Sequence, residues 1–179
     1  MVTHAMVDLE TLDVTPQAVI LTIGGVKFDP FHTGKEPHSD FYMRLEFESQ
    51  EGRGRVINKD TLNWWSRQDE EIINEALGDH DRHSVEQMLA SLKKWFVGCD
   101  KIWAQGICFD ISMLEDIHRQ YGYPVPWAFY QVEDSRTIIN RMPRDPRKDM
   151  DFAAHNALED CKVQAKSLQL AFKHFGFVK

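Results

Sequence analysis

His4-Ala-Met-Val-Asp-Leu-Glu-Thr-Leu12 is an apolar stretch that carries two acidic residues, Asp8 and Glu10. Its pattern predicts a short buried strand over residues 4–9. Side chains two positions apart on a strand point to the same face of the sheet, so these two carboxylates would repel each other unless a cation lies between them. The alternative is that one of them faces solvent and pairs with a lysine.

The next two segments also have strand character. Ala18-Val-Ile-Leu-Thr-Ile-Gly-Gly-Val-Lys-Phe28 predicts a second strand, in which Gly24 and Gly25 indicate a bulge or the close approach of another backbone. Phe41-Tyr-Met-Arg-Leu-Glu-Phe47 alternates in polarity, as a half-buried strand does. Turn-forming residues separate the three segments, so we predict an antiparallel meander.

After this meander the apolar spacing becomes helical and then alternates between helix and strand. We predict helices over residues 60–67, 70–77, 84–96, 111–121, 136–141 and 156–174, and strands over residues 101–105 and 129–132. Three antiparallel strands followed by alternating helices and strands indicate an α/β fold, with a mixed β-sheet flanked by helices. The length of 179 residues suits a single domain over residues 1–179.

The composition is that of an ordinary soluble globular protein, with 42% hydrophobic and 27% charged residues. No apolar run approaches the ~20 residues that span a bilayer, and the N-terminus lacks the pattern of a secretory signal. Cys99, Cys108 and Cys161 lie in apolar or helical contexts, which predicts three buried thiols rather than disulfides or a zinc site. We therefore expect a cytoplasmic protein with no membrane partner.

The formal net charge of −7 argues at first against a nucleic-acid partner. Positive charge is concentrated in residues 136–148, however, where five basic residues stand against one acidic residue. This segment could face a phosphate chain if cations neutralise the carboxylates elsewhere. The alternative is a solvated loop rich in charge.

Two further acids lie near the starts of predicted helices. Asp110 ends Trp103-Ala-Gln-Gly-Ile-Cys-Phe-Asp110 and could be a helix N-cap, a site residue or both, while Phe109 would face the core or a nucleobase. His155 and Asp160 are ~140° apart around a helix, so we place His155 on the turn before the helix and Asp160 one turn further in. A histidine beside a metal ligand suits a water-activating base, and the alternative is a surface histidine that ends a loop.

Together, the four acids predict one site. Asp8, Glu10, Asp110 and Asp160 all lie against residues that normally mark a core element, and a buried carboxylate is costly unless a metal or partner compensates its charge. Converging carboxylates form a site for hard divalent cations such as Mg²⁺ or Mn²⁺. The sequence thus indicates metal-assisted chemistry on phosphate.

These motifs resemble the DEDDh branch of the DnaQ-like 3′-5′ exonucleases, which have an RNase H-like fold. Asp8-Leu-Glu10 resembles their Asp-x-Glu motif, Phe109-Asp110 their second motif, and His155 to Asp160 their His-x4-Asp motif. Within that superfamily, the chain is similar to a compact group that includes phage exodeoxyribonuclease A and a mycobacterial 3′-5′ exoribonuclease.

One position departs from the superfamily pattern. Gly106 stands where many members carry an asparagine, four residues before the second-motif aspartate, and Gln105 lies one position earlier. A contact between Gln105 and the nucleotide is one reading of this arrangement.

The resemblance implies a metal-dependent 3′-5′ exonuclease that releases nucleoside 5′-monophosphates from single-stranded or 3′-overhanging RNA or DNA. The four acids would hold two Mg²⁺ or Mn²⁺ ions, and His155 would take a proton from the attacking water. Residues expected at the substrate are Thr11 for the terminal sugar, Leu12 as a wedge against the last bases, Gln105, Phe109, and the supporting pair Asp134 and Arg136. The resemblance also allows a homodimer.

Trp64 and Trp65 would offer a stacking platform for a single strand. The alternative is that one of the two belongs to the core and the other to the rim. Two other functions are open as well: an RNase H-like endonuclease, and a non-catalytic nucleic-acid-binding module of the same fold. The choice between RNA and DNA depends on contacts around the 2′-hydroxyl, which the sequence does not place.

Overall fold

A mixed six-stranded sheet, in the order β4-β3-β2-β1-β5-β6, forms the centre of the protein. The computed structural model describes residues 2–150, 152 and 155–179. The strands are β1 (His4–Thr11), β2 (Ile20–Phe28), β3 (His38–Leu45), β4 (Arg82–His83), β5 (Lys101–Ala104) and β6 (Val132–Asp134). β2 pairs antiparallel with β1 and β3, whereas β5 pairs in parallel with β1 and β6. The predicted meander and mixed α/β sheet are therefore confirmed.

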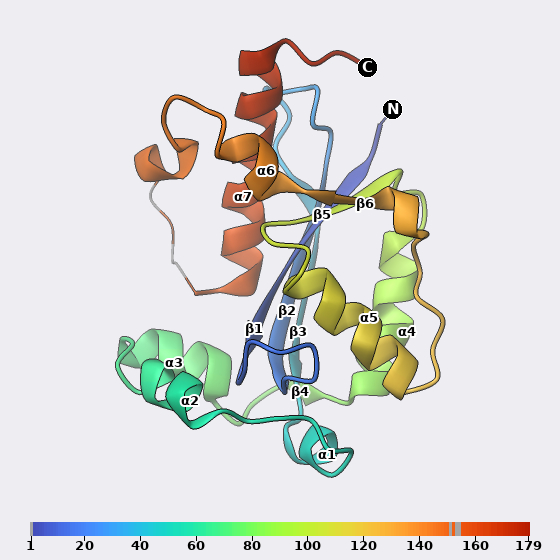
Figure 1. Cartoon of the computed structure of the whole chain (residues 1–179), viewed down its shortest axis with the longest axis vertical. Coiled ribbons are helices and arrows are strands. Elements are labelled where there is room, and N and C mark those ends of the chain that lie inside the picture. The colour runs from blue at the N-terminus through green and yellow to red at the C-terminus, as the bar shows by residue number, and fades with distance from the viewer. Residues whose placement is uncertain (1, 151, 153–154) are drawn as a thin grey trace.

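Helices cover both faces of this sheet, with α6 and α7 on one side and α4 and α5 on the other (Figure 1). The short helices α2 and α3 lie together near the end of β1 (Figure 1). The α-helices are α1 (Glu48–Glu51), α2 (Lys59–Trp65), α3 (Glu70–Leu77), α4 (Val85–Phe96), α5 (Asp110–Gln120), α6 (Ser135–Ile139) and α7 (Ala157–Phe175). Two 3₁₀ helices, η1 (Phe129–Gln131) and η2 (Pro146–Asp149), complete the set among the described residues.

The two faces of β1 carry different side chains because successive residues on a strand point in opposite directions. The core shared with α4 and α5 contains Ala5, Val7 and Leu9. Met6 packs instead in a second cluster with α7 residues such as Leu168. Asp8 and Glu10 share the parity of Met6, so β1 presents both acids to the face that α7 covers.

The α7 helix approaches β2 closely because residue 24 is a glycine. A Cβ atom at Gly24 would lie 2.2 Å from the backbone carbonyl carbon of Ala157. The neighbouring Gly25 marks an irregularity, since the β2–β3 register shifts between Gly25 and Lys27. The bulge and the close approach are both present, and the first turn of α7 lies against the strand next to β1.

An asparagine cap defines the start of α7. Asn156 Oδ1 accepts hydrogen bonds from the backbone N–H groups of Leu158 at 3.1 Å and Glu159 at 3.2 Å, as N-cap side chains do. His155, one residue earlier, has a φ of +63°, which is uncommon for a residue with a Cβ. The predicted place of His155 on the turn before the helix is therefore confirmed.

Some details differ from the prediction. The segment 129–132 begins as the 3₁₀ helix η1, and the strand β6 follows it. The two-residue strand β4, which pairs in parallel with β3, is too short to show a periodicity in the sequence. Cys108 is exposed, so only Cys99 and Cys161 are buried thiols. Within the described ranges, no helix combines the length and the hydrophobicity needed to cross a bilayer.

Candidate active site

Acidic residues from three separate elements meet in one pocket. Asp8 and Glu10 come from β1, Asp110 is the first residue of α5, and Asp160 lies in the first turn of α7. Together with His155 they line a pocket of about 270 Å³. The structure thus brings together all five residues that were predicted for catalysis.

Asp110 reaches the pocket because β5 runs parallel to β1 and α5 begins shortly after β5 ends. Asp110 Oδ1 accepts a hydrogen bond from the backbone N–H of Leu9 at 3.1 Å, which ties the start of α5 to β1. Phe109, not Asp110, occupies the N-cap position of α5. Ligand atoms of Asp8, Glu10 and Asp160 lie within 4.8 Å of one another, and Asp110 lines the same pocket outside that trio.

Burial and mutual repulsion oppose the ionisation of these acids. Desolvation, followed by repulsion from the other three acids, raises the pKa of Asp8 well above its usual value. Desolvation and repulsion from Asp160 and Asp110 raise the pKa of Glu10 to about 8. Desolvation also raises the pKa of Asp160, and it raises that of Asp110 to about 7 although the hydrogen bond from Leu9 opposes the change.

This donor set fits divalent cations. Carboxylate oxygens are the ligands that Mg²⁺ and Mn²⁺ prefer, and three of the acids already lie within 4.8 Å of one another. Burial is the main cause of the raised pKa values of Glu10 and Asp110, because it disfavours the ionised carboxylates, and a bound cation would offset this effect. A bound cation would therefore favour the ionised form of these acids.

His155 lies beside the acids and against α2. Its ring is edge-on to that of Trp64, with 4.9 Å between the ring centroids and an interplanar angle of 84°. Desolvation raises the pKa of Asp160, and the charge of His155 is the first of the effects that oppose this rise. The imidazole therefore lies beside the acidic cluster and lines the same pocket.

Gln164 also lines the pocket, although it was not among the residues predicted from the sequence. Its Nε2 donates a hydrogen bond to Asp8 Oδ1 at 2.9 Å, and its side chain lines the pocket. The available signal was its spacing, because Gln164 follows Asp160 by one helical turn and so lies on the same face of α7.

Arg136 and Asp134 support the segment between β5 and α5. Arg136 lines the pocket and donates from Nη2 to the carbonyl of Gln105 at 2.6 Å. Asp134 Oδ2 accepts from the backbone N–H of Ile107 at 3.3 Å, and its Oδ1 accepts from that of Thr137 at 2.9 Å. Asp134 therefore fixes the loop between β5 and α5 through hydrogen bonds to its backbone, while Arg136 lines the pocket.

The same segment accounts for the departure at Gly106. Gly106 has a φ of +138°, a backbone conformation that favours glycine over asparagine. Gln105 and Phe109 on either side of it both line the acidic pocket. A nucleotide contact by Gln105 stays a prediction.

A second hollow, of about 580 Å³, adjoins the acidic pocket and shares Leu9, Glu10 and Phe109 with it. Thr11 and Trp64 also line this hollow, here called the adjoining hollow. It lies on the side of β1 where the strand ends and α2 begins.

Two predicted substrate contacts are corrected by burial. Leu12 is 3% exposed and packs with Leu21 in the core, so it does not stand out as a wedge. Trp65 is 1% exposed and donates its Nε1–H to the carbonyl of Thr11 at 2.9 Å, so it is the core residue of the pair and little of its ring is open to a base. Trp64, 41% exposed, is the rim residue of the pair.

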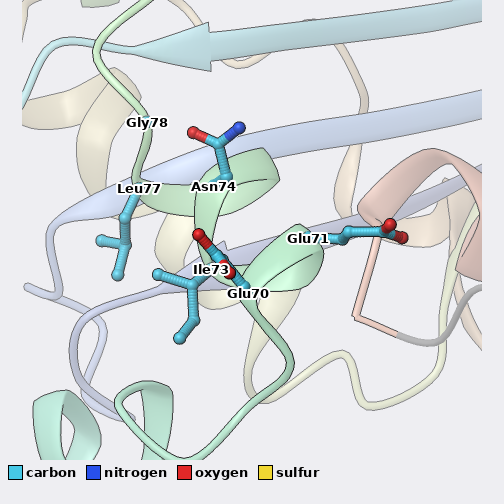
Figure 2. Close-up of a pocket in the computed structure, with 6 residues that line it drawn as sticks. All are labelled: Glu70, Glu71, Ile73, Asn74, Leu77 and Gly78. Atoms are coloured by element: carbon cyan, nitrogen blue, oxygen red, sulfur yellow. The ribbon is translucent and has the colours of Figure 1, made fainter.

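A third hollow, of about 590 Å³, shares no lining residue with the acidic pocket. It is lined by five residues of α3 and by Gly78, which follows the helix (Figure 2). Figure 2 shows Glu71 extending away from the other labelled side chains. None of the predicted site residues lines this hollow, so it has no part in the site.

The basic segment 136–148 contributes part of its charge to the site. Besides Arg136, the charge of Arg147 acts to lower the pKa of Asp160. Arg147 is also paired with Asp145, with 2.6 Å between Nη2 and Oδ2. Part of the segment therefore brings positive charge to the acidic pocket, and part of it is a loop with an internal ion pair.

Comparison with known proteins agrees with this geometry. The family model described as the Rv2179c-like 3′-5′ exoribonuclease domain matches residues 3–172. Among curated proteins, the chain is similar to the exodeoxyribonuclease of Enterobacteria phage T4. The two are 24% identical over 204 residues, which cover 94% of this chain and 88% of that relative.

Solved nuclease structures share the fold. Exonuclease X in complex with 5′ overhanging duplex DNA gives a TM-score of 0.62 at 14% identity, covering 98% of this chain and 94% of that one. The nuclease domain of 3′hExo, a DEDDh family member bound to rAMP, gives a TM-score of 0.61 at 14% identity, covering 96% and 92%. The chain spans less of two longer nucleases, 64% of cell-death related nuclease 4 and 43% of E. coli exonuclease I.

At these identities the structural likeness is one of fold, and it confirms the predicted RNase H-like architecture. The family match extends over nearly the whole chain, and the motifs that suggested the DEDDh exonucleases lie within it. The chain therefore belongs to the Rv2179c-like family of 3′-5′ exoribonuclease domains.

Proposed function

We propose that the protein removes nucleoside 5′-monophosphates from the 3′ ends of RNA or DNA by cation-assisted hydrolysis. The observation that carries this proposal is the convergence of Asp8, Glu10, Asp110 and Asp160 in one pocket beside His155. Two Mg²⁺ or Mn²⁺ ions held by these acids would activate water and stabilise the charge that develops on the phosphate.

The chain's own side chains supply the proton transfer. His155 lines the pocket next to the acidic trio, so its ring can take a proton from the attacking water. The water oxygen then forms a bond to phosphorus, the bond from phosphorus to the 3′ oxygen breaks, and that oxygen takes a proton from solvent. The edge-on contact with Trp64 restricts the orientation of the imidazole during this exchange.

The adjoining hollow suits the terminal nucleoside. Its shared wall with the acidic pocket, formed by Leu9, Glu10 and Phe109, would bring the last phosphodiester next to the acids. The exposed ring of Trp64 offers a surface for a base at its rim. Exonuclease X binds overhanging duplex DNA and 3′hExo binds rAMP, so we extend the proposal to both kinds of strand.

Digestion of 3′-labelled strands tests this function. Single strands, duplexes and overhangs of DNA and RNA are incubated with Mg²⁺ or Mn²⁺, and labelled mononucleotide is expected as the first product. Activity should disappear with a chelator and in Asp8→Asn, whereas Asp79→Asn, which alters an exposed acid outside the pocket, should be as active as the wild type. Full activity in Asp8→Asn would refute the proposal.

Two controls address the competing functions. A circular single strand has no 3′ end, so an exonuclease leaves it intact and an RNase H-like endonuclease cuts it. A non-catalytic binding module would bind strands at low salt without releasing mononucleotides on addition of metal. The homodimer and the cytoplasmic location stay predictions.

A further inference from the structure

Gln164 has a buried side-chain amide that links α7 to Asp8 on β1. Its side chain is 5% exposed, and its Nε2 donates to Asp8 Oδ1 at 2.9 Å. Asp160, four residues earlier on α7, lies on the same helical face. The helix therefore supplies one acid to the cluster and, one turn later, a hydrogen bond to another.

The polar atoms of Gln164 have little other use in the described part of the chain. Its Oε1 is buried and has no hydrogen-bond partner among the described residues. An unpaired buried amide oxygen is unfavourable, so a residue that only filled space here would better be apolar. The hydrogen bond to Asp8 is what distinguishes a glutamine from a methionine of similar length at this position.

The kind of donor also matters. Asp8 lies among acids that repel it, and a donor on its Oδ1 holds the carboxylate in place against that repulsion. An amide does so without a positive charge, whereas a lysine or arginine would neutralise Asp8 and compete with a cation for it. Neighbours that orient a metal ligand in this way typically contribute 10- to 100-fold to metal affinity or activity.

We propose that Gln164 is a positioning residue that holds Asp8 in the orientation needed to bind the divalent cations. This inference rests on the proposed function, because it concerns the same carboxylates. The amide donates to Oδ1 of Asp8, which would leave Oδ2 for a cation. Gln164 itself needs to contact neither the cation nor the substrate.

The direct test is Mn²⁺ binding to Gln164→Met, measured by titration calorimetry without substrate. The expected result is an affinity ~10- to 100-fold weaker than that of the wild type. In the digestion assay kcat should fall while KM for the strand changes little, because strand contacts are untouched. Unchanged Mn²⁺ affinity in Gln164→Met would overturn the inference.

Gln169→Met is a matched control on the same helix. Gln169 is 2% exposed, and its Nε2 donates to the carbonyls of Asp29 at 2.9 Å and His32 at 3.1 Å, away from the acids. This variant loses a buried amide of the same kind and should bind Mn²⁺ within about twofold of the wild type, since no metal ligand is touched. An equal loss of affinity in the two variants would mean that general damage to α7 is the cause, and would overturn the inference.

A double-mutant cycle separates positioning from packing. Combined with Asp8→Asn, Gln164→Met should weaken Mn²⁺ binding no further, because the oriented carboxylate is already gone. An additive loss would overturn the inference.

If Gln164→Met does not fold, Gln164→Asn takes its place. The amide of asparagine is one methylene too short to reach Asp8, so the same loss of Mn²⁺ affinity is expected. Wild-type affinity in this variant would overturn the inference. A wild-type protein that binds no Mn²⁺, or an active Asp8→Asn, would refute the proposed function instead.

Discussion

Replacing Glu10 by glutamine is expected to stabilise the metal-free protein at neutral pH while removing its activity. Desolvation and repulsion from Asp160 and Asp110 raise the pKa of Glu10 from 4.5 to about 8. The folded protein therefore keeps a proton on Glu10 that the unfolded chain has released by pH 7. Glutamine has the same shape as glutamate but is neutral at every pH, so it neither takes up a proton on folding nor is repelled by the neighbouring acids.

The size of the effect follows from the difference between the two pKa values. A raised folded-state pKa gives stability that is fully present below about pH 4.5 and is lost as the pH rises to about 8. Each pH interval of one between the two pKa values corresponds to ~1.4 kcal/mol. Glu10 therefore lowers the free energy of unfolding by on the order of 3 kcal/mol at pH 7, and by below about 1 kcal/mol at pH 5. The gain in unfolding free energy of Glu10→Gln over the wild type should therefore be larger at pH 7 than at pH 5.

Urea denaturation in the presence of a chelator, at pH 5 and at pH 7, measures this. The exposed acid Glu51 on α1 provides the control, and Glu51→Gln should shift the midpoint equally little at both pH values. Addition of Mn²⁺ should raise the stability of the wild type at pH 7 and leave Glu10→Gln nearly unchanged. An advantage of Glu10→Gln that is absent at pH 7, or equal at the two pH values, would refute the reasoning about the buried charge.

Further predictions concern the base, the helix contact and the tryptophan pair. His155→Ala should slow turnover by ~10²- to 10⁴-fold with little change in strand affinity, measured at saturating substrate, and a loss confined to binding would contradict its role as base. Gly24→Ala would place a Cβ 2.2 Å from the α7 backbone, so urea denaturation should show a loss of about 1–3 kcal/mol together with weaker activity; unchanged stability would contradict the close approach. Trp65→Phe removes the buried hydrogen bond to the Thr11 carbonyl and should cost about 1–3 kcal/mol, whereas Trp64→Phe should cost less than about 0.5 kcal/mol; equal losses would contradict the core and rim assignment.

Much of the fold could be predicted because the decisive segments have clear local patterns. The alternation around Asp8 and Glu10 gives both the strand and the shared face of the two acids. The five-residue spacing from His155 to Asp160 gives the turn before α7 and the first helical turn. These features depend on neighbours in the sequence, so they are visible before the chain is folded.

What the sequence did not reveal depends on how elements pack against one another. The contact between Gln164 and Asp8 depends on how α7 packs against β1, whereas the spacing of Gln164 from Asp160 indicates only that the two share a face of the helix. Which of Trp64 and Trp65 is buried depends on the rotation of α2 about its axis. Leu12 is buried for a similar reason, since the chain after β1 turns back toward β2 and the core rather than toward solvent.

The most direct test of the central claim is anomalous diffraction from a crystal of the protein soaked with Mn²⁺. The account predicts anomalous peaks within the acidic pocket, at coordination distance from carboxylate oxygens of Asp8, Glu10, Asp110 and Asp160. The same soak of Asp8→Asn should give weaker peaks or none. Mn²⁺ bound only outside this pocket, or no Mn²⁺ in a wild-type crystal that is active in solution, would contradict the account.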